Sequence, residues 1–299
     1  MTTLLIHSDE YANWVFRSSH PTQGRRFINA KNLFEQYLPD VKVMSPRLAT
    51  EEELSLVHSN EYIDYVIKQY KSGEWEGSRS DLANLAQMFV GGTIVALEAL
   101  LSEDFLTAVH FPGAKHHAQR EHSSGFCVFA DFAIAAEIAT SRFGKKVAII
   151  DIDAHHGDGT ENLTIDNPNV LSYSVHEYGI FPGTGYDSYP EYNAYNYALG
   201  LHDIEKTDQA LLRGVSIFIE EAKSFNPDLI FIACGADGHK EDPLSNLEYS
   251  VDGYTQVAKL LCENFPKTPF LMGGAGGYLP DTRTPEVWAN FAKTISSRL

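Results

Sequence analysis

Five apolar runs of strand length, separated by amphipathic stretches of helical length, constrain the fold of this chain more than any other feature of its sequence. The runs are Thr107–Phe111, Lys146–Ile152, Val170–Val175, Asp228–Cys234 and Pro269–Met272. The amphipathic stretches are Asp131–Arg142, Asp208–Ser224 and Tyr254–Glu263. Fully apolar strands that alternate with helices are typical of a parallel sheet covered by helices on both faces. The sequence therefore predicts an α/β fold, in which ligands bind at the carboxyl ends of the strands.

The chain is 299 residues long, a length that α/β enzymes reach as a single unit. No internal repeat, low-complexity segment or linker divides it, so we expect one domain over residues 1–299. The first residues, Met1–His7, predict a short strand. The segment Tyr186–Tyr197 is rich in Tyr and Asn and predicts a long surface loop.

Composition narrows the classes of partner. The formal net charge of −17 repels nucleic acid phosphates and attracts cations, so we expect a cationic substrate and no direct nucleic-acid binding. An acidic surface also serves solubility alone, and that alternative stays open. We see no run of about 18 apolar residues and no leader sequence, and we expect neither a membrane span nor a signal peptide. Cys127, Cys234 and Cys262 are odd in number and scattered, which favours free thiols in the cytoplasm.

The strongest local motif lies at the end of the run Lys146–Ile152. It delivers Asp151, Asp153, His155, His156 and Asp158 within eight residues. Side chains of a strand alternate with period two, so Asp153 and His155 share a side, and carboxylate plus imidazole is a ligand set that zinc accepts. Asp237 follows another apolar run and is placed to be a third ligand. The alternative is that these polar residues cap helices or form turns at strand ends.

A pair of adjacent histidines, His116 and His117, follows the first apolar run. Hydrolysis of an amide needs a base for the attacking water and an acid for the leaving amine, and histidine can do both. Each imidazole then needs a carboxylate on its other nitrogen, and Asp151 and Asp158 are available. A His-His pair in isolation is more often structural; beside the candidate metal ligands it favours catalysis.

A glycine-rich run, Gly273–Gly277, precedes Tyr278. It lacks the lysine and the spacing of a phosphate-binding loop, which argues against a nucleotide site. Tyr278 is instead placed to donate a hydrogen bond to a carbonyl oxygen as negative charge develops on it. The alternative for a single tyrosine is a half-buried packing residue.

Six motifs occur in an order that resembles the histone deacetylase superfamily, which includes acetylpolyamine amidohydrolases and acetoin-utilisation proteins of bacteria. They are His116-His117, Ser124-Gly-Phe-Cys, Asp151-x-Asp-x-His-His-Gly-Asp-Gly, Phe181-Pro-Gly-Thr-Gly, Gly235-Ala-Asp and Gly276-Gly-Tyr. The resemblance extends from His7 to Trp288, essentially the whole chain. It implies an arginase-like fold with a mainly parallel sheet of about eight strands flanked by helices.

The resemblance implies roles for the motif residues. Asp153, His155 and Asp237 are implied to be the ligands of Zn²⁺, for which Fe²⁺ is an alternative. His117, partnered by Asp158, is implied to be the general base and acid. His116, partnered by Asp151, is implied to be an electrostatic histidine, and Tyr278 to stabilise the oxyanion.

The resemblance also implies a narrow substrate tunnel and sites for a monovalent cation. The tunnel residues are Phe126, Phe181, Gly125, Gly276 and Arg26. Core packing is the alternative for the two phenylalanines. One K⁺ or Na⁺ site near the zinc draws on Asp151, Asp153, His155, Ser174 and Val175, and a second on Thr164, Asn167 and Val170.

The sequence as a whole predicts a zinc-dependent amidohydrolase that removes the acyl group from an acylated primary amine, such as acetyl-lysine or an acetylpolyamine, and releases acetate after attack by a metal-activated water. Two alternatives are a ureohydrolase with two metal ions on the same fold and a non-catalytic scaffold that binds acyl-lysine. The chain departs from the family pattern at Pro112–Lys115, directly before the histidine pair, and in the glycine run, which contains Ala275. Glu76 is our candidate for an acid that grips substrate. The acyl group, the amine and the oligomeric state stay open.

Overall fold

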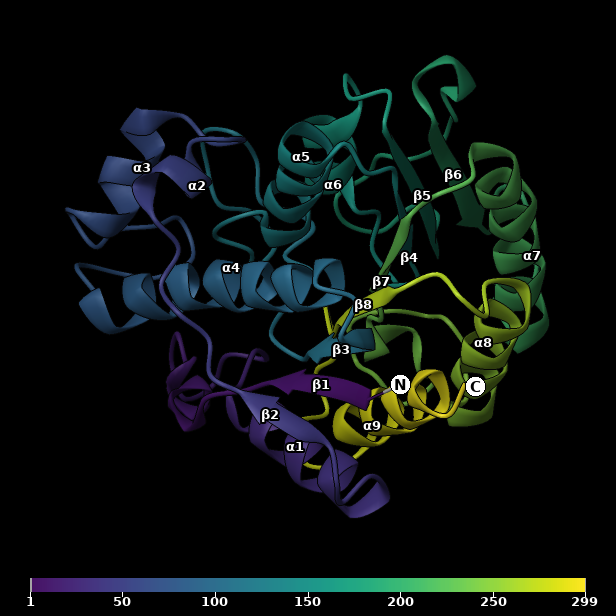
Figure 1. The fold of residues 1–299 in the computed structure, drawn as a ribbon. Helices are drawn as coiled ribbons and strands as arrows, with labels where there is room; N and C mark the ends of the chain where they lie inside the picture. Colours follow the sequence, from purple (N-terminus) through teal and green to yellow (C-terminus); the bar gives the residue numbers. More distant parts are fainter. Residues whose placement is uncertain (1, 299) are drawn as a thin grey trace.

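The centre of the molecule is one sheet of eight strands, all parallel, in the order β2-β1-β3-β8-β7-β4-β5-β6 (Figure 1). The computed structural model describes residues 2–298. The strands are β1 (Thr2–Ile6), β2 (Lys42–Met44), β3 (Phe105–His110), β4 (Val147–Asp151), β5 (Val170–Glu177), β6 (Ala194–Leu199), β7 (Leu229–Ala233) and β8 (Phe270–Gly273). The predicted parallel α/β sheet is thereby confirmed.

Helices cover both faces of this sheet (Figure 1). The α-helices are α1 (Arg25–Tyr37), α2 (Glu51–Leu54), α3 (Asn60–Ile67), α4 (Ser80–Leu101), α5 (Asp131–Phe143), α6 (Asp158–Thr164), α7 (Asp208–Phe225), α8 (Val251–Asn264) and α9 (Arg283–Ser296). Short 3₁₀ helices are η1 (Asp9–Asn13), η2 (Pro190–Tyr192) and η3 (Ala236–Gly238). Helices α1, α9, α8 and α7 form one layer, and α4, α5 and α6 form the other.

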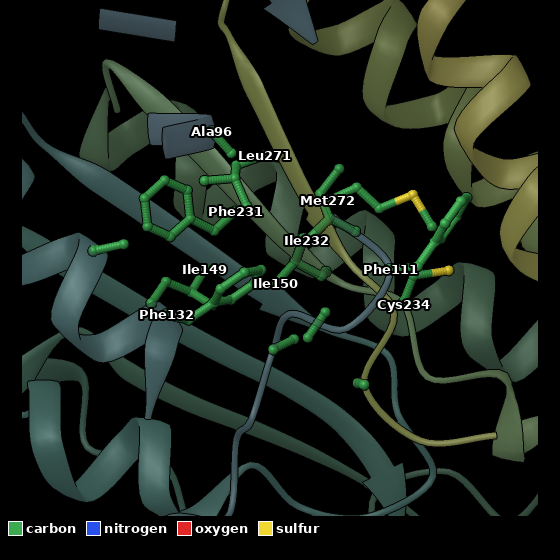
Figure 2. Close-up of a cluster of buried hydrophobic side chains, with 14 of the residues drawn as sticks. Ala96, Phe111, Phe132, Ile149, Ile150, Phe231, Ile232, Cys234, Leu271 and Met272 are labelled. Atoms are coloured by element: carbon green, nitrogen blue, oxygen red, sulfur yellow. The ribbon is translucent and has the colours of Figure 1, made fainter. Parts of the chain in front are cut away.

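The core lies on both faces of the central strands. Every residue of β3, β4, β7 and β8 is buried, as expected for parallel strands enclosed by two helical layers. Figure 2 shows Phe132 of α5 beside Phe231 of β7, with ring centroids 5.3 Å apart. An aromatic pair of this kind stabilises a fold by about 0.5–1.5 kcal/mol beyond the area that it buries.

Helix α4 is long and apolar enough to span a membrane by length and composition alone. In the structure, however, 67% of its most apolar window is buried within the protein. The helix contacts β1, β3 and α5, and Ala96 on it faces the core cluster of Figure 2. It is therefore a core helix of this fold.

The prediction of a surface loop over Tyr186–Tyr197 is wrong in its last part. Strand β6 begins at Ala194 and pairs with β5, and the ring of Tyr195 stacks on Tyr173 at 6.2 Å. β6 is the last strand of the sheet, and its half-buried tyrosines alternate with buried small or polar residues. An edge strand of this composition lacks the continuous apolar run that marks the inner strands.

Four strands that carry the candidate site are neighbours in the sheet although they are far apart in the chain. Their order is β3-β8-β7-β4, so the loops that follow them leave from the same edge. The chain passes from β3 through α5 to β4, which lies beyond β8 and β7. A sheet in which the order switches in this way opens a crevice at the carboxyl ends of its strands.

Candidate active site

The three predicted metal ligands come together at this edge. Asp153 and His155 lie in the loop after β4, and Asp237 lies in η3 after β7. Strands β4 and β7 are paired, with Asp151 opposite Ala233, so the two loops begin side by side. One ligand atom from each of the three side chains lies within 4.8 Å of the other two.

Backbone N–H groups hold the two carboxylates in place. Oδ1 of Asp153 accepts from the N–H of His155 at 2.9 Å, and Oδ2 accepts from that of Gly276 at 2.7 Å. Oδ1 of Asp237 accepts from the N–H of Ala154 at 3.0 Å. A Cβ on Gly276 would lie 2.3 Å from Oδ2 of Asp237. The loop after β8 therefore needs glycine here for its backbone to approach the carboxylates.

The charges of this cluster fit a divalent cation. Asp153 and Asp237 are both fully buried, and Nδ1 of His155 lies 3.2 Å and 2.9 Å from their carboxylates. Burial opposes protonation of His155, but the two carboxylates outweigh it and raise the pKa of this histidine to about 11. One imidazole cannot offset two buried carboxylates, whereas a divalent ion can. Two carboxylates and an imidazole suit Zn²⁺ and also Fe²⁺.

The histidine pair lies beside this cluster, each ring on its own carboxylate. Nδ1 of His116 lies 2.7 Å from Oδ2 of Asp151, and Nδ1 of His117 lies 2.7 Å from Oδ1 of Asp158. The two imidazole centroids are 3.9 Å apart. Because each carboxylate contacts Nδ1, the Nε2 atom of each ring is the nitrogen left for other partners.

The two imidazoles differ in protonation although they are neighbours. Burial, and then the positive charge of His116, lower the pKa of His117 to about 4. Burial acts in the same direction on His116, but Asp151 and Asp153 outweigh it and raise the pKa of His116 to about 9. At neutral pH His117 is therefore neutral and can accept a proton, while His116 is cationic.

A pocket of about 400 Å³ opens over these groups. It is lined by His117, Gly125, Phe126, His155, Ile180, Phe181, Leu244 and Tyr278. The ring of Phe181 lies 5.0 Å from that of His117, and the ring of Phe126 lies 5.9 Å from that of Tyr278. The walls are thus largely apolar and aromatic, while the polar groups are at the base.

Tyr278 reaches the pocket from the loop after β8. Its backbone N–H donates to Oδ2 of Asp242 at 2.8 Å, which fixes the loop. Burial, and then the nearby Asp237 and Asp153, raise the pKa of the phenol well above its usual 10. The phenol therefore stays protonated and is available as a hydrogen-bond donor.

Two predicted tunnel residues, Gly276 and Arg26, do not line this pocket. Gly276 lies beneath it and binds Asp153, as described above. Arg26 is 3% exposed, donates from Nη1 to the carbonyl of Gly277, and has its guanidinium 5.8 Å from the ring of Tyr278. Both residues belong to the layer behind the pocket rather than to its wall.

Several residues at the pocket carry no motif that identifies them. Ile180 and Leu244 line the wall and resemble any other apolar loop residue in the sequence. Glu74, rather than the expected Glu76, contacts the wall: its Oε2 accepts from the N–H of Phe126 at 3.0 Å. Glu76 is exposed and lines a neighbouring pocket.

The loop that carries Phe181 is anchored by two further histidines. Nδ1 of His156 lies 2.8 Å from the hydroxyl of Thr184, and Nε2 of His176 donates to the carbonyl of Gly185 at 3.0 Å. The two imidazole centroids are 4.8 Å apart. His156 immediately follows the candidate metal ligand His155, so this contact links the loop after β4 to the aromatic wall.

The residues assigned to monovalent cation sites form two local groups. Ser174, in the middle of β5, is the register partner of Asp151 at the end of β4, and Val175 follows it; Asp153 and His155 lie in the loop after β4. Thr164, Asn167 and Val170 lie in successive turns between α6 and β5, where Asn167 N–H donates to Thr164 and Val170 N–H to Asn167.

Comparison with known proteins gives a consistent result. The model of the histone deacetylase domain matches residues 20–295. The acetoin utilization protein AcuC of Bacillus subtilis (strain 168) is 32% identical, over 96% of this chain and 80% of the relative. AcuC of Staphylococcus aureus (strain MSSA476) is 30% identical over the same shares, and AcuC of Staphylococcus xylosus is 29% identical over 97% and 81%.

Proposed function

The chain belongs to the histone deacetylase family, and from that premise we propose that it is a zinc-dependent deacetylase of an acylated primary amine. Family membership makes it a hydrolase that acts on amide bonds. One observation carries the finer proposal: the Asp153–His155–Asp237 cluster and the His117–Asp158 pair lie together at the base of one apolar pocket. Fe²⁺ remains the alternative ion.

Each polar group at the base of the pocket has a chemical task in this proposal. When bound, the metal ion lowers the pKa of water and polarises an amide carbonyl. His117, neutral and held by Asp158, takes a proton at Nε2 from the attacking water and returns it to the nitrogen of the leaving amine. Tyr278 donates its O–H to the oxygen that gains negative charge. His116, held by Asp151, supplies a fixed positive charge beside the reaction.

The walls of the pocket suit a thin, flexible chain. Phe126 and Phe181 can enclose a methylene chain between two rings and exclude water around it. The side chain of acetyl-lysine and an acetylpolyamine both end in an amide on such a chain, and the negative charge of the protein favours a cationic remainder. We propose either as the substrate, in a cytoplasmic enzyme with K⁺ or Na⁺ between the end of β4 and the middle of β5.

A second metal ion would indicate a ureohydrolase instead. Within residues 2–298, one group of three or more His, Cys, Asp or Glu side chains is arranged to hold a metal. We therefore favour a single ion and hydrolysis of an amide over hydrolysis of a guanidinium group.

The first test is acetate release by the zinc-loaded protein from a matched panel: an acetyl-lysine peptide, acetylputrescine, acetylspermidine and a guanidino compound. We expect acetate from at least one acetylated amine, no urea from the guanidino compound, and about one metal ion per chain by elemental analysis. Urea release with two ions per chain would replace this proposal by the ureohydrolase.

The roles of Tyr278 and His117 are tested by substitution. We expect Tyr278→Phe to lower kcat by about 10²–10³, which is the usual effect of removing one donor to an oxyanion. His117→Ala should be at least as severe while metal content stays unchanged, because His117 is not a ligand. Tyr189→Phe, at an exposed tyrosine that does not line the pocket, is the matched control. Full activity of Tyr278→Phe, or loss of metal from His117→Ala, would refute the corresponding role.

A further inference from the structure

A chain of four buried polar side chains lies behind the histidine pair and takes no part in the proposed reaction. Tyr11 of η1, Thr93 of α4, His110 of β3 and Asp131 of α5 are all fully buried. Helix α4 packs against the three other elements (Figure 1). A Cβ on Gly92 of α4 would lie 2.6 Å from Nε2 of His110, so this helix leaves room for the ring. Polar side chains in a core are costly unless each finds a hydrogen-bond partner, so their presence here needs a reason.

The hydrogen bonds of this chain have one consistent direction. Nδ1 of His110 lies 3.0 Å from the hydroxyl oxygen of Thr93, which in turn donates to Oδ2 of Asp131 at 2.5 Å. Because the hydroxyl proton is directed to Asp131, the hydroxyl oxygen accepts from Nδ1–H of His110. Nε2 of His110 is then the acceptor for the phenol of Tyr11, at 3.0 Å. Burial is the main cause that lowers the pKa of His110 to about 3, so the ring is neutral at neutral pH and has this single tautomer.

The chain ends on Asp131, whose carboxylate holds the loop before the histidine pair. Oδ1 accepts from the backbone N–H of Lys115 at 2.6 Å, and Oδ2 accepts from that of Ala114 at 3.0 Å. Asp131 is also the first residue of α5, where the helix dipole favours a negative charge. Together with the hydroxyl of Thr93, three donors converge on the two oxygens. The carboxylate therefore fixes two consecutive N–H groups directly before His116.

The loop needs such a partner because its backbone is strained at Ala114. This residue has a φ of 64°, in the left-handed region where its Cβ crowds the following carbonyl oxygen. A non-glycine residue keeps this conformation only where its surroundings hold it there. Ala114 lies in Pro112–Lys115, the segment at which the chain departs from the family pattern. The hydrogen bond from its own N–H to Asp131 offsets part of the strain.

The histidine pair is thus held from two sides. On the side of the pocket, the carboxylates at Nδ1 orient the two rings, and the N–H of Thr160 donates to the carbonyl of His116 at 3.0 Å. On the opposite side, Asp131 fixes the backbone that delivers the pair. A general base acts only within hydrogen-bond reach of its proton, and a misplacement of about 1 Å can lower a rate by about 10²-fold. The position of His117 therefore depends on the loop as well as on the carboxylate beside its ring.

We propose that Asp131, oriented by Thr93 and His110, is a positioning residue that holds the strained loop so that His117 meets the attacking water. This inference rests on the proposed amide hydrolysis and adds to it a layer of residues behind those that line the pocket. Within the described part of the chain, Asp131 forms no hydrogen bond with the candidate metal ligands and does not line the pocket. Its loss should therefore lower turnover and leave the binding of substrate and metal unchanged.

The first comparison is between zinc-loaded wild type and Asp131→Asn. In either orientation of the asparagine amide, its NH₂ group faces a donor of the protein, because both carboxylate oxygens now accept from N–H groups. For the acetylated amine that wild type cleaves fastest, we expect kcat to fall by about 10- to 100-fold. KM and zinc content should stay within about twofold, because the positions of the pocket walls and the metal ligands do not depend on Asp131. Asp252→Asn removes the same charge from the first turn of α8 and is the matched control, with unchanged kcat.

Variants of Thr93 test the same role if Asp131→Asn does not fold. Thr93→Val keeps the shape of the side chain and removes the hydroxyl, whereas Thr93→Ser keeps the hydroxyl. We expect kcat to fall by about tenfold in Thr93→Val and to stay within about twofold in Thr93→Ser. Thermal unfolding of every variant verifies that it is folded.

Glycine at position 114 tests the strain directly. Ala114→Gly removes the steric cost of the left-handed backbone, so the loop depends less on Asp131. In the Asp131→Asn background it should raise kcat by about 5- to 30-fold, the factor that corresponds to the cost of one left-handed non-glycine residue. Ala118→Gly is the matched control, because Ala118 is equally buried on the other side of the pair and has no positive φ. It should not restore kcat.

The imidazole N–H protons give a readout that needs no turnover. Nδ1 of His116 and of His117 each lies 2.7 Å from a carboxylate oxygen, and a proton in so short a hydrogen bond gives a ¹H NMR signal at low field. In Asp131→Asn these signals should shift, and in the double variant with Ala114→Gly they should return towards their wild-type positions.

The outcomes separate this inference from the proposed function. Unchanged kcat and unchanged imidazole signals in folded Asp131→Asn or Thr93→Val would refute the positioning role and leave the proposed function intact. A loss of kcat that Ala114→Gly does not relieve, or equal effects of Thr93→Val and Thr93→Ser, would also refute it. If wild type cleaves no amide but the imidazole signals still depend on Asp131, the proposed function fails and the hold of Asp131 on the histidine pair stands.

Discussion

At Gly276 the backbone approaches two carboxylates more closely than any side chain would allow. An added Cβ would lie 2.3 Å from Oδ2 of Asp237 and 2.6 Å from Oδ2 of Asp153. Both of these oxygens belong to the proposed metal ligands, and the N–H of Gly276 orients one of them. A single glycine thus connects the loop after β8 to the proposed ligands in the loops after β4 and β7.

We expect Gly276→Ala to weaken zinc binding by about 10- to 100-fold, the range found when a group that orients a metal ligand is lost. The methyl group would push Asp237 and Asp153 apart, so the loss should appear in metal affinity measured by competition with a chelator. Gly73→Ala is the control, since its Cβ would lie 3.1 Å from the hydroxyl of Ser123 and 3.9 Å from its carbonyl oxygen, with no carboxylate among its nearest neighbours. Unchanged zinc affinity in folded Gly276→Ala would contradict the proposed ligand set.

At the scale of elements, a buried histidine ties the α2–α3 segment to the loops that carry the pocket wall. His58 lies between these helices and is 2% exposed. Nδ1 donates to the carbonyl of Gln119 at 2.9 Å, and Nε2 accepts from the N–H of Ala130 at 3.0 Å. A protonated ring would present an N–H to the N–H of Ala130. Burial is the main cause that lowers the pKa of His58 to about 4.

The pH dependence of stability follows from this shift. In the unfolded chain His58 becomes protonated near pH 6.5, whereas in the folded protein it does so only near pH 4. The neutral ring therefore makes its whole contribution to the free energy of unfolding above pH 6.5. It is lost progressively as the pH falls from 6.5 to 4. We expect the destabilisation by His58→Asn, measured by urea unfolding, to shrink by about 2–3 kcal/mol between pH 7 and pH 4.5. Comparing wild type with the variant cancels the contribution of the other histidines, and an equal effect at both pH values would refute the assignment.

The elements differ in how far the sequence predicts them. The inner strands β3, β4, β7 and β8 are continuous apolar runs, and the observed bounds differ from the predicted ones by one or two residues. Helix α4 escapes prediction because its apolar residues surround the axis instead of forming a stripe, since it is buried on most sides. Strand β6 is not predicted for the opposite reason: it lies at the edge of the sheet and therefore needs no continuous apolar run.

The residues of the candidate site also differ in how far the sequence predicts them. The ligand and histidine motifs are local in sequence, so the grouping of Asp153, His155 and Asp237 can be anticipated. Ile180, Leu244 and the contact of Glu74 with Phe126 arise only when loops from distant parts of the chain pack together. The position of Arg26 behind the pocket depends likewise on how α1 packs against the loop after β8.

At the scale of the whole molecule, charge acts on the substrate before any contact forms. The chain carries 40 acidic and 23 basic side chains, a formal net charge of −17. This net charge supports the proposal that the substrate is a cationic amine.

This arrangement predicts a salt-dependent preference among acetyl-lysine peptides. At low ionic strength kcat/KM should be several-fold higher for a peptide flanked by lysine and arginine than for one flanked by glutamate, because the field of the protein raises the local concentration of cations. The Debye length falls from about 10 Å at 0.1 M salt to about 3 Å at 1 M, so the preference should nearly vanish at high salt. A peptide with neutral flanks is the control and should respond least to salt. If the preference for basic flanks persists at 1 M salt, specific contacts at the pocket mouth rather than the net charge select the amine; if no preference appears at low salt, the acidic surface serves solubility alone.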